Sequence, residues 1–130
     1  MPLEIGIKGS SSCTVTLNDT AKALGSGGLD VLSTPKLIAL MENAALLSVR
    51  PYLEEGSDTV GTLLNVKHLA ATPVGMTVRA EAELIEIDRR RLVFSVKAWD
   101  EVELVGEGTH ERFIVDMEKF TNKCNSKIKK

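Results

Sequence analysis

The segment from Ser33 to Leu47 constrains the fold more than any other part of this chain. It has the composition of a helix, which Ser33 or Thr34 can cap at its start and Pro51 ends. Apolar residues occupy most of its circumference. A helix of this kind needs cover on nearly all sides, and a curved sheet wrapped around it would supply that cover.

The rest of the chain has the period-two pattern of strands. Two short strands are predicted before the helix, over residues 5–8 and 13–17. Four longer strands are predicted after it, over residues 59–69, 76–87, 92–98 and 102–117. The apolar set changes parity at Ile85, which indicates a bulge, and residues 88–90 form a hairpin turn. One long helix with a curled antiparallel sheet is an α+β arrangement, the hotdog fold. Its exposed edge strands would favour a homodimer.

Length and composition point to one domain, over residues 1–120. The chain has 130 residues, of which 43% are hydrophobic and 26% charged, as in an ordinary soluble protein. It has no apolar run long enough to span a bilayer and no signal peptide, so we expect a cytoplasmic protein without a membrane partner. Residues 121–130 form a basic C-terminal tail that we expect to be frayed and solvated rather than a nucleic-acid arm.

The chain shows no metal-binding pattern. Cys13 and Cys124 lie far apart and outside any Cys-x-x-Cys pair, which favours two free thiols. His68 and His110 are also separated, and no spacing of a zinc site is present. We therefore expect no metal.

Glu42 is the first candidate functional residue. Its neighbours three and four positions away on the helix are all apolar: Ile38, Ala39, Ala45 and Leu46. An ionised carboxylate in such a setting costs several kcal/mol unless it is paired. His68 is the natural partner, because an imidazole can shuttle protons near neutral pH. The alternative is a structural carboxylate that caps backbone amides.

Three strings of residues resemble the fluoroacetyl-CoA thioesterase family of hotdog proteins. They are Leu-Met-Glu-Asn-Ala at 40–44, His-Leu-Ala-Ala-Thr-Pro-Val-Gly at 68–75, and Gly-Thr-His-Glu-Arg at 108–112. The similarity extends from about residue 33 to residue 120. It implies hydrolysis of a small acyl-CoA thioester to a free acid and coenzyme A. Coenzyme A is then part of the substrate, and no cofactor is needed.

The resemblance also implies the site residues. The family's catalytic threonine, glutamate and histidine correspond to Thr34, Glu42 and His68, and its substrate-binding glycine and arginine to Gly61 and Arg112. Each has a structural alternative: Thr34 as a helix cap, Gly61 as an ordinary strand glycine, and Arg112 as an ion-pair partner of a nearby glutamate. The nucleophile stays open between Glu42, Thr34 and water.

The chain departs from the family in the loop before the helix. The fluoroacetate enzyme has a lid phenylalanine there, whereas residues 25–30 contain no aromatic side chain. A general small-acyl-CoA thioesterase is therefore the prediction, as a homodimer or a tetramer. Two other functions stay open on the same fold: an enoyl- or hydroxyacyl-thioester hydratase, and a non-catalytic acyl-CoA-binding module.

Overall fold

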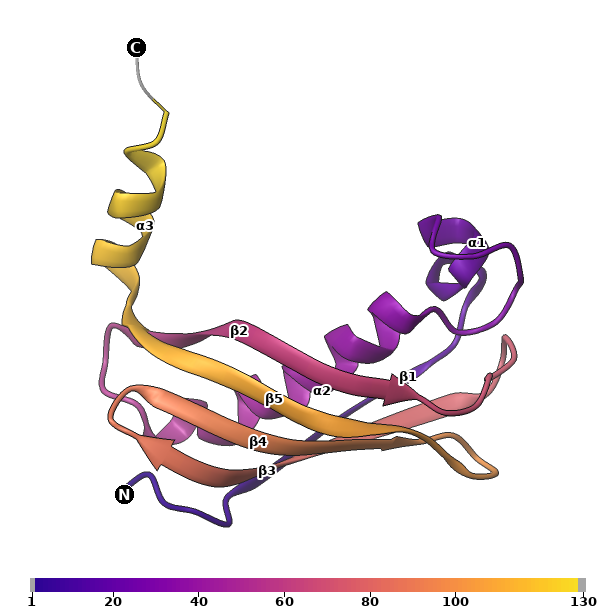
Figure 1. Ribbon diagram of the computed structural model, residues 1–130, viewed down its shortest axis with the longest axis horizontal. Coiled ribbons are helices and arrows are strands. Elements are labelled where there is room, and N and C mark those ends of the chain that lie inside the picture. The colour runs from indigo at the N-terminus through magenta and orange to yellow at the C-terminus, as the bar shows by residue number, and fades with distance from the viewer. Residues whose placement is uncertain (1, 129–130) are drawn as a thin grey trace.

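The protein is a curved sheet of five antiparallel strands packed against one long helix, which is the predicted α+β arrangement (Figure 1). This computed structural model describes residues 2–128. The strands are β1 (Lys8–Thr14), β2 (Ser57–His68), β3 (Thr77–Asp88), β4 (Arg91–Trp99) and β5 (Leu104–Asp116); the helices are α1 (Ala21–Leu24), α2 (Thr34–Val49) and α3 (Met117–Asn125). Short 3₁₀ turns occupy Leu17–Asp19 and Arg50–Tyr52. The strand order is β1-β3-β4-β5-β2, so β1 and β2 are the edges.

Helix α2 begins at the predicted position, and Ser33 is its cap. The Ser33 hydroxyl accepts a hydrogen bond from the Lys36 amide at 3.1 Å. This bond satisfies one of the amides that a helix start leaves unpaired. The Thr34 side chain is therefore free for another partner.

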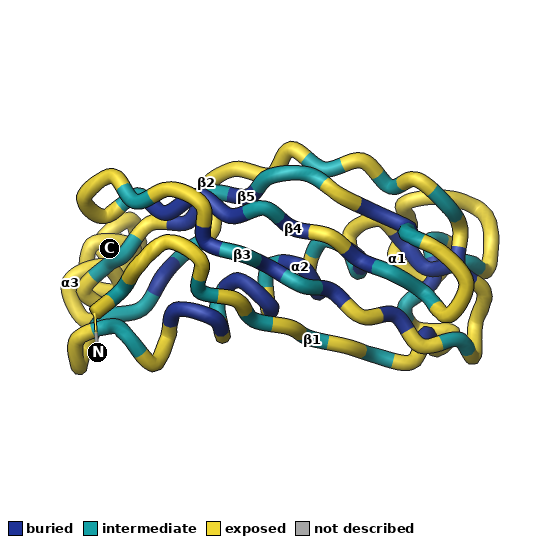
Figure 2. The backbone as a smooth tube through the Cα atoms, turned by 90° about the horizontal axis from the view of Figure 1, so that it is seen from below, coloured by how far each residue is buried: buried dark blue, intermediate teal, exposed yellow. Residues whose placement is uncertain are grey.

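One face of α2 packs on the sheet, and the opposite face is open. Figure 2 shows buried segments along α2, β3 and β4, whereas β1 is exposed or half-buried. Ala39, Asn43 and Leu47 on the far face are exposed. The prediction that the sheet covers the helix on nearly all sides is therefore wrong for one copy of the chain, because the five strands curve around only one side.

The strand register shifts in three strand pairs, one of them β4–β5 between Ala98 and Trp99. The register between β3 and β4 shifts between Leu84 and Glu86, which confirms the bulge predicted from the parity change at Ile85. A second shift, between Gly61 and Leu63 of β2, was not predicted. It leaves Thr62 as the extra residue and changes the local direction of the edge strand.

The two ends of the chain differ from the sequence prediction. The first strand is one element, β1, rather than two short pieces, and a 3₁₀ turn occupies Leu17–Asp19. Residues 117–125 form α3, although a frayed end was expected from residue 121. Asp116 caps α3 by accepting a hydrogen bond from the Lys119 amide at 3.0 Å. Helix α3 projects away from the sheet beyond the β2 edge (Figure 1).

Candidate active site

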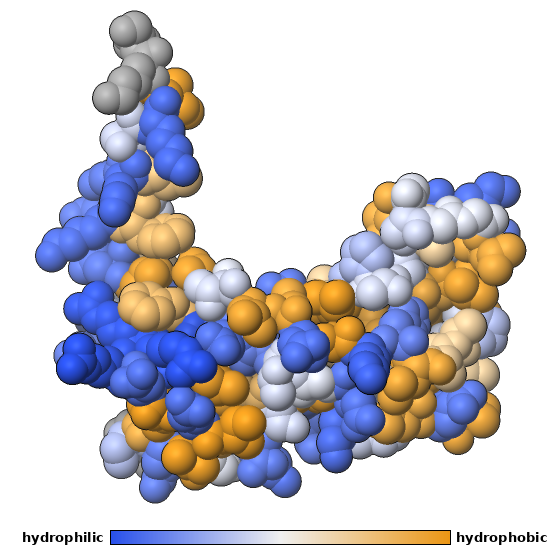
Figure 3. Space-filling model, viewed as in Figure 1, coloured by the Kyte–Doolittle hydropathy of each residue, from blue (hydrophilic) through white to orange (hydrophobic). Residues whose placement is uncertain are grey.

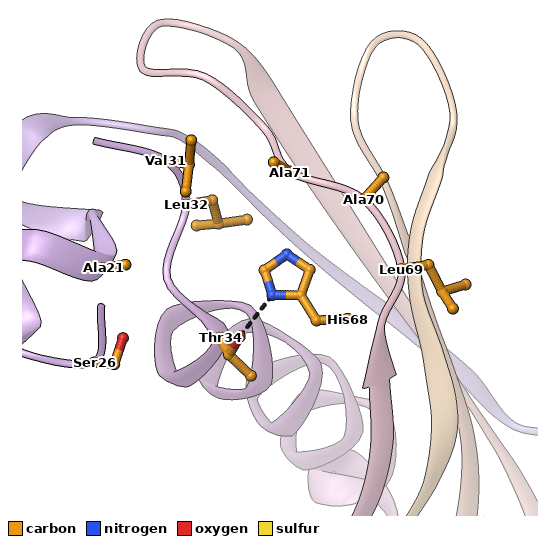
Figure 4. A pocket seen from close by; sticks show the side chains of 9 residues that line it. All are labelled: Ala21, Ser26, Val31, Leu32, Thr34, His68, Leu69, Ala70 and Ala71. Atoms are coloured by element: carbon orange, nitrogen blue, oxygen red, sulfur yellow. Dashed lines mark hydrogen bonds between the residues drawn. The ribbon is translucent and has the colours of Figure 1, made fainter. Parts of the chain in front are cut away.

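Thr34 and His68 meet at one end of the sheet. Thr34 occupies the first turn of α2, and His68 is the last residue of β2. Thr34 Oγ1 and His68 Nδ1 are 2.7 Å apart, a short hydrogen bond (Figure 4). This is the hydroxyl–imidazole arrangement that can activate an alcohol as a nucleophile.

Burial holds His68 in its neutral form. Loss of water contact lowers its pKa from the ordinary value of 6.5, and the nearby Ala70 backbone opposes that change in part. A neutral imidazole is the form that can accept a proton. With Nδ1 accepting from Thr34, Nε2 carries the hydrogen. Nε2 is buried and forms no hydrogen bond with any residue between 2 and 128, so a buried donor lacks an acceptor here.

A cavity of about 330 Å³ surrounds this pair. Figure 4 shows the His68 ring lying over the first turn of α2, with its unbonded nitrogen directed away from the helix. The other lining residues are small or aliphatic: Ala21, Ser26, Val31, Leu32, Leu69, Ala70 and Ala71. The loop that lacks the lid aromatic contributes only Ser26 to this wall.

Glu42 lies in a second group, near the middle of α2. Its carboxylate faces β2 at Gly61: a Cβ added to Gly61 would lie 2.8 Å from Glu42 Oε2. The same point lies 3.2 Å from His110 Cε1 and 3.4 Å from Arg112 Nη1. A carboxylate, an imidazole and a guanidinium thus converge on the one position of β2 that has no side chain.

Hydrogen bonds fix the Arg112 guanidinium inside this second group. Arg112 is buried; its Nε donates to Thr59 Oγ1 and its Nη2 to the Thr59 carbonyl, both at 2.8 Å. Its pKa is lowered by burial, and attraction to Glu42 opposes the change. Arg112 forms no ion pair with a glutamate among residues 2–128, so its structural alternative is not observed; the neighbouring Glu111 pairs with Arg91 at 2.9 Å instead.

His110 links Arg112 to the bulge in β2. It is fully buried, with Nδ1 2.9 Å from the Leu63 carbonyl and Nε2 3.2 Å from Arg112 Nη1. Because a guanidinium only donates, Nε2 is the acceptor and Nδ1–H donates to Leu63. Burial lowers the pKa of His110. The hydrogen bond to the Leu63 carbonyl opposes this decrease, whereas the positive charge of Arg112 adds to it, so the ring stays neutral.

The predicted site residues therefore fall into two groups in one protomer. Thr34 is hydrogen-bonded to His68, whereas Glu42 lies with Gly61 and Arg112. The predicted pairing of Glu42 with His68 is not formed, since no hydrogen bond among the described residues joins them. Eight helical residues separate Thr34 from Glu42, a rise of about 12 Å. Glu42 is also half-buried rather than enclosed, because the outer face of α2 is open.

His110 and Thr59 were not among the predicted site residues. His110 and Arg112 are two residues apart on β5, so their side chains lie on the same face of the sheet, the face toward the helix. This spacing was the sequence feature that could have identified His110 as a neighbour of Arg112. Thr59 carried no signal, since its contact with Arg112 depends on the register of β2 against β5.

Residues 2–128 contain neither a metal-binding cluster nor a membrane-spanning helix. No group of three or more histidine, cysteine, aspartate or glutamate side chains there is arranged to hold a metal ion. No helix in the same range combines the length and apolar character needed to cross a membrane.

Comparison with known proteins gives the family. The family model described as fluoroacetyl-CoA-specific thioesterase matches residues 15–118. A fluoroacetyl-CoA thioesterase from Streptantibioticus cattleyicolor is 44% identical over 98 residues, covering 75% of this chain and 70% of the relative.

Solved structures agree with this match. The structure of the fluoroacetyl-CoA thioesterase FlK superposes with a TM-score of 0.92 and 35% identity, covering 99% of this chain and 100% of FlK. A thioesterase superfamily member from Thermus thermophilus gives a TM-score of 0.88 at 28% identity, covering 96% of this chain and 93% of that one. The chain therefore belongs to the fluoroacetyl-CoA-specific thioesterase family and has the hotdog fold of the thioesterase superfamily.

Proposed function

We propose that the protein hydrolyses a small acyl-CoA thioester, with Thr34 as nucleophile, His68 as its base and Glu42 as the group that activates water. The observation that carries this proposal is the 2.7 Å contact between Thr34 Oγ1 and His68 Nδ1 beside a small cavity. The neutral His68 ring supports it, because only that form takes the threonine proton.

The reaction has two steps. Thr34 Oγ1 attacks the thioester carbonyl and gives its proton to His68 Nδ1; the carbon–sulfur bond breaks, and the coenzyme A thiolate takes that proton. Water then attacks the threonyl ester and gives one proton to Glu42. The ester bond breaks, the free acid leaves, and Glu42 returns that proton by way of His68 to the Thr34 oxygen, so that all three side chains regain their starting states. The Gly61 amide and the Arg112 guanidinium are the donors near the acyl oxygen.

This mechanism needs Thr34 and Glu42 at one carbonyl, which a homodimer would provide. In one protomer they are about 12 Å apart along α2. Gly61 and His68 are about 23 Å apart along β2, at 3.3 Å per residue. Antiparallel pairing of β2 with a second copy, centred near Leu64, would bring His68 of one protomer beside the partner's Gly61 and the partner's Glu42.

The surface of β2 supports such a dimer. Its outer edge pairs with no other strand of the described chain, and residues 61–65 are all exposed. Leu63 is 45% and Leu64 36% exposed. Figure 3 shows a saddle between α3 and the α1 region, with hydrophobic side chains along its floor at β2. An unpaired, apolar strand edge is usually covered in a native assembly.

Mixed dimers test the site and the dimer together. Thr34→Ala and Glu42→Ala homodimers should each be nearly inactive in a thiol-release assay with acetyl-CoA. Unfolding and refolding an equal mixture should restore about a quarter of wild-type activity, since half the dimers are mixed and each has one intact site. Native mass spectrometry shows whether mixed dimers have formed. If they have formed and no activity is recovered, the shared site is overturned. No thiol release by wild type from any short acyl-CoA would overturn the function.

A further inference from the structure

The cavity beside Thr34 and His68 is larger than an acetyl group needs. Its volume is about 330 Å³. A methylene group is close in size to a water molecule, which takes about 30 Å³ in the liquid, so the cavity has room for about ten such groups. An acetyl group places a single methyl beyond the thioester carbonyl. The volume therefore points to a longer acyl chain.

Small side chains create this room. Ala21 of α1, Ser26 of the following loop, and Ala70 and Ala71 after β2 form much of the wall. Figure 4 shows Ala21 and Ser26 on the α1 side of the cavity, and Ala70 and Ala71 beyond the His68 ring. A larger side chain at any of these positions would shorten the space that is open to a substrate.

Backbone hydrogen bonds hold the α1 side of the wall in place. The Ser26 amide donates to the Ala21 carbonyl, and the Ala21 amide donates to the Val31 carbonyl, both at 2.9 Å. The Leu32 amide donates to the Thr72 carbonyl at 2.8 Å, which ties this segment to the chain that follows β2. Sites for small molecules are usually formed before the ligand binds, and these bonds give the cavity that property.

The wall is suited to a hydrocarbon chain. Among residues 2–128, those that line the cavity include no charged side chain, and its polar side chains are Ser26, Thr34 and the neutral His68. A carboxylate at the end of an acyl chain would lose its hydration there without gaining a cationic partner, which is costly. The wall therefore favours an uncharged acyl group.

The dimensions of the cavity limit the length of that group. A rounded cavity of this volume is about 8 Å across, and an extended chain advances about 1.2 Å per bond, so about six or seven carbons span it. Ala21 stands at the α1 end of this span. A Cβ added to Gly27 would lie 3.2 Å from Ala21 Cβ, so the loop packs directly behind Ala21. A larger side chain at position 21 would therefore extend into the cavity.

We propose that the protein prefers uncharged acyl chains of about four to seven carbons to acetyl, and that Ala21 sets the upper limit of chain length. The inference rests on the proposed thioesterase function and names the class of acyl group that the site accepts.

A series of substrates tests the preference by thiol release. Burial of each methylene should raise kcat/KM about threefold, so hexanoyl-CoA should exceed acetyl-CoA by about 80-fold. Dodecanoyl-CoA should fall below hexanoyl-CoA, because its chain is longer than the cavity. Glutaryl-CoA should be at least about tenfold poorer than pentanoyl-CoA, which has the same number of acyl carbons and no carboxylate. The highest kcat/KM for acetyl-CoA, or equal values for glutaryl-CoA and pentanoyl-CoA, would overturn the inference.

Two variants of α1 test the role of Ala21. Ala21→Leu adds about 90 Å³ of side chain, so the ratio of kcat/KM for hexanoyl-CoA to that for acetyl-CoA should fall about tenfold. Ala23→Leu makes the same substitution on the same helix at an exposed position outside the cavity wall, and its ratio should change less than about twofold. An unchanged ratio in Ala21→Leu would overturn the assignment. If Ala21→Leu does not fold, Ala71→Leu, at an exposed position of the same wall, makes the same test.

Binding experiments separate the inference from the proposed function. If wild type releases thiol from none of these substrates, the proposed function fails. Calorimetry with two thioethers, S-ethyl-coenzyme A and S-hexyl-coenzyme A, then tests the cavity alone. The hexyl compound should bind wild type about 80-fold more tightly than the ethyl compound, and Ala21→Leu should reduce this difference. Equal affinity of wild type for the two thioethers would overturn the inference.

Discussion

Replacing Gly61 with alanine should separate the position of the Glu42 carboxylate from the stability of the fold. The added Cβ would lie 2.8 Å from Glu42 Oε2, whereas ordinary contact begins near 3.4 Å, so the oxygen must retreat by about 0.6 Å. Misplacement of a reacting group by about 1 Å can cost about 10²-fold in rate. We therefore expect kcat for acetyl-CoA to fall about 10- to 100-fold.

Stability should change little in Gly61→Ala. The atom displaced is the end of a flexible side chain, and the Gly61 φ is not in the left-handed region, so alanine fits the backbone. Its lower unfolded-state entropy offsets the tight 3.2 Å contact with His110 Cε1, and the free energy of unfolding should stay within about 1 kcal/mol of wild type. Urea denaturation and thiol release give the two quantities.

Glu42→Gln is the companion variant for this experiment. If Gly61→Ala acts through Glu42, adding it to Glu42→Gln should lower kcat much less than adding it to wild type, since sites that act as a unit are non-additive. A folded Gly61→Ala protein with wild-type kcat would refute the reasoning, because the carboxylate would then have no role where the structure puts it.

Four further outcomes follow from the contacts above. Thr34→Val should lower kcat at least about 100-fold with a near-wild-type melting temperature, because Ser33 and not Thr34 caps α2; a folded, fully active variant would exclude the threonine nucleophile. His110→Leu should reduce kcat/KM, because Arg112 loses the hydrogen bond that its guanidinium donates to His110. The amide of His110→Gln can still accept that hydrogen bond, so this variant should retain part of the lost activity. An equal loss of kcat/KM in both variants would argue against a role of His110 in positioning Arg112. Burial lowers the pKa of His68 and His110 in the folded protein, so the unfolded chain binds more protons than the folded one below about pH 6.5. The free energy of unfolding should therefore fall as the pH drops from about 7 to about 5. Urea titrations that give the same free energy of unfolding over this pH range would contradict the prediction. Gly9→Ala should destabilise the fold by about 1–3 kcal/mol, because the new Cβ would lie 2.6 Å from the Ala44 carbonyl oxygen on α2; an unchanged denaturation midpoint would contradict the close packing of β1 on the helix.

Local pattern was enough to predict the main elements of the fold. The cap and the proline that bound α2, the period-two strands and the bulge after Leu84 all depend on residues close together in sequence. Helix α3 was missed because its exposed, lysine-rich sequence resembles a solvated tail; the Asp116 cap at the end of β5 was the local signal for it.

Grouping of the site residues depended on tertiary structure. The sequence and its family resemblance identified Thr34, Glu42 and His68 as candidates, but nothing local to them tells which histidine faces the glutamate. The length of β2 carries His68 to the start of α2, and the register of β5 brings His110 beside Arg112 and Glu42.

The sequence by itself therefore determined the helix, the strands and the candidate residues, because these follow from spacing along one segment. Only the tertiary structure decided that Thr34 bonds His68, that Glu42 lies against Gly61, and that α1 and the end of β2 enclose a cavity of small side chains. Each of these contacts joins segments far apart in the chain. Strand order and register set such distances, and they are fixed by packing of the whole sheet on α2 rather than by any local pattern.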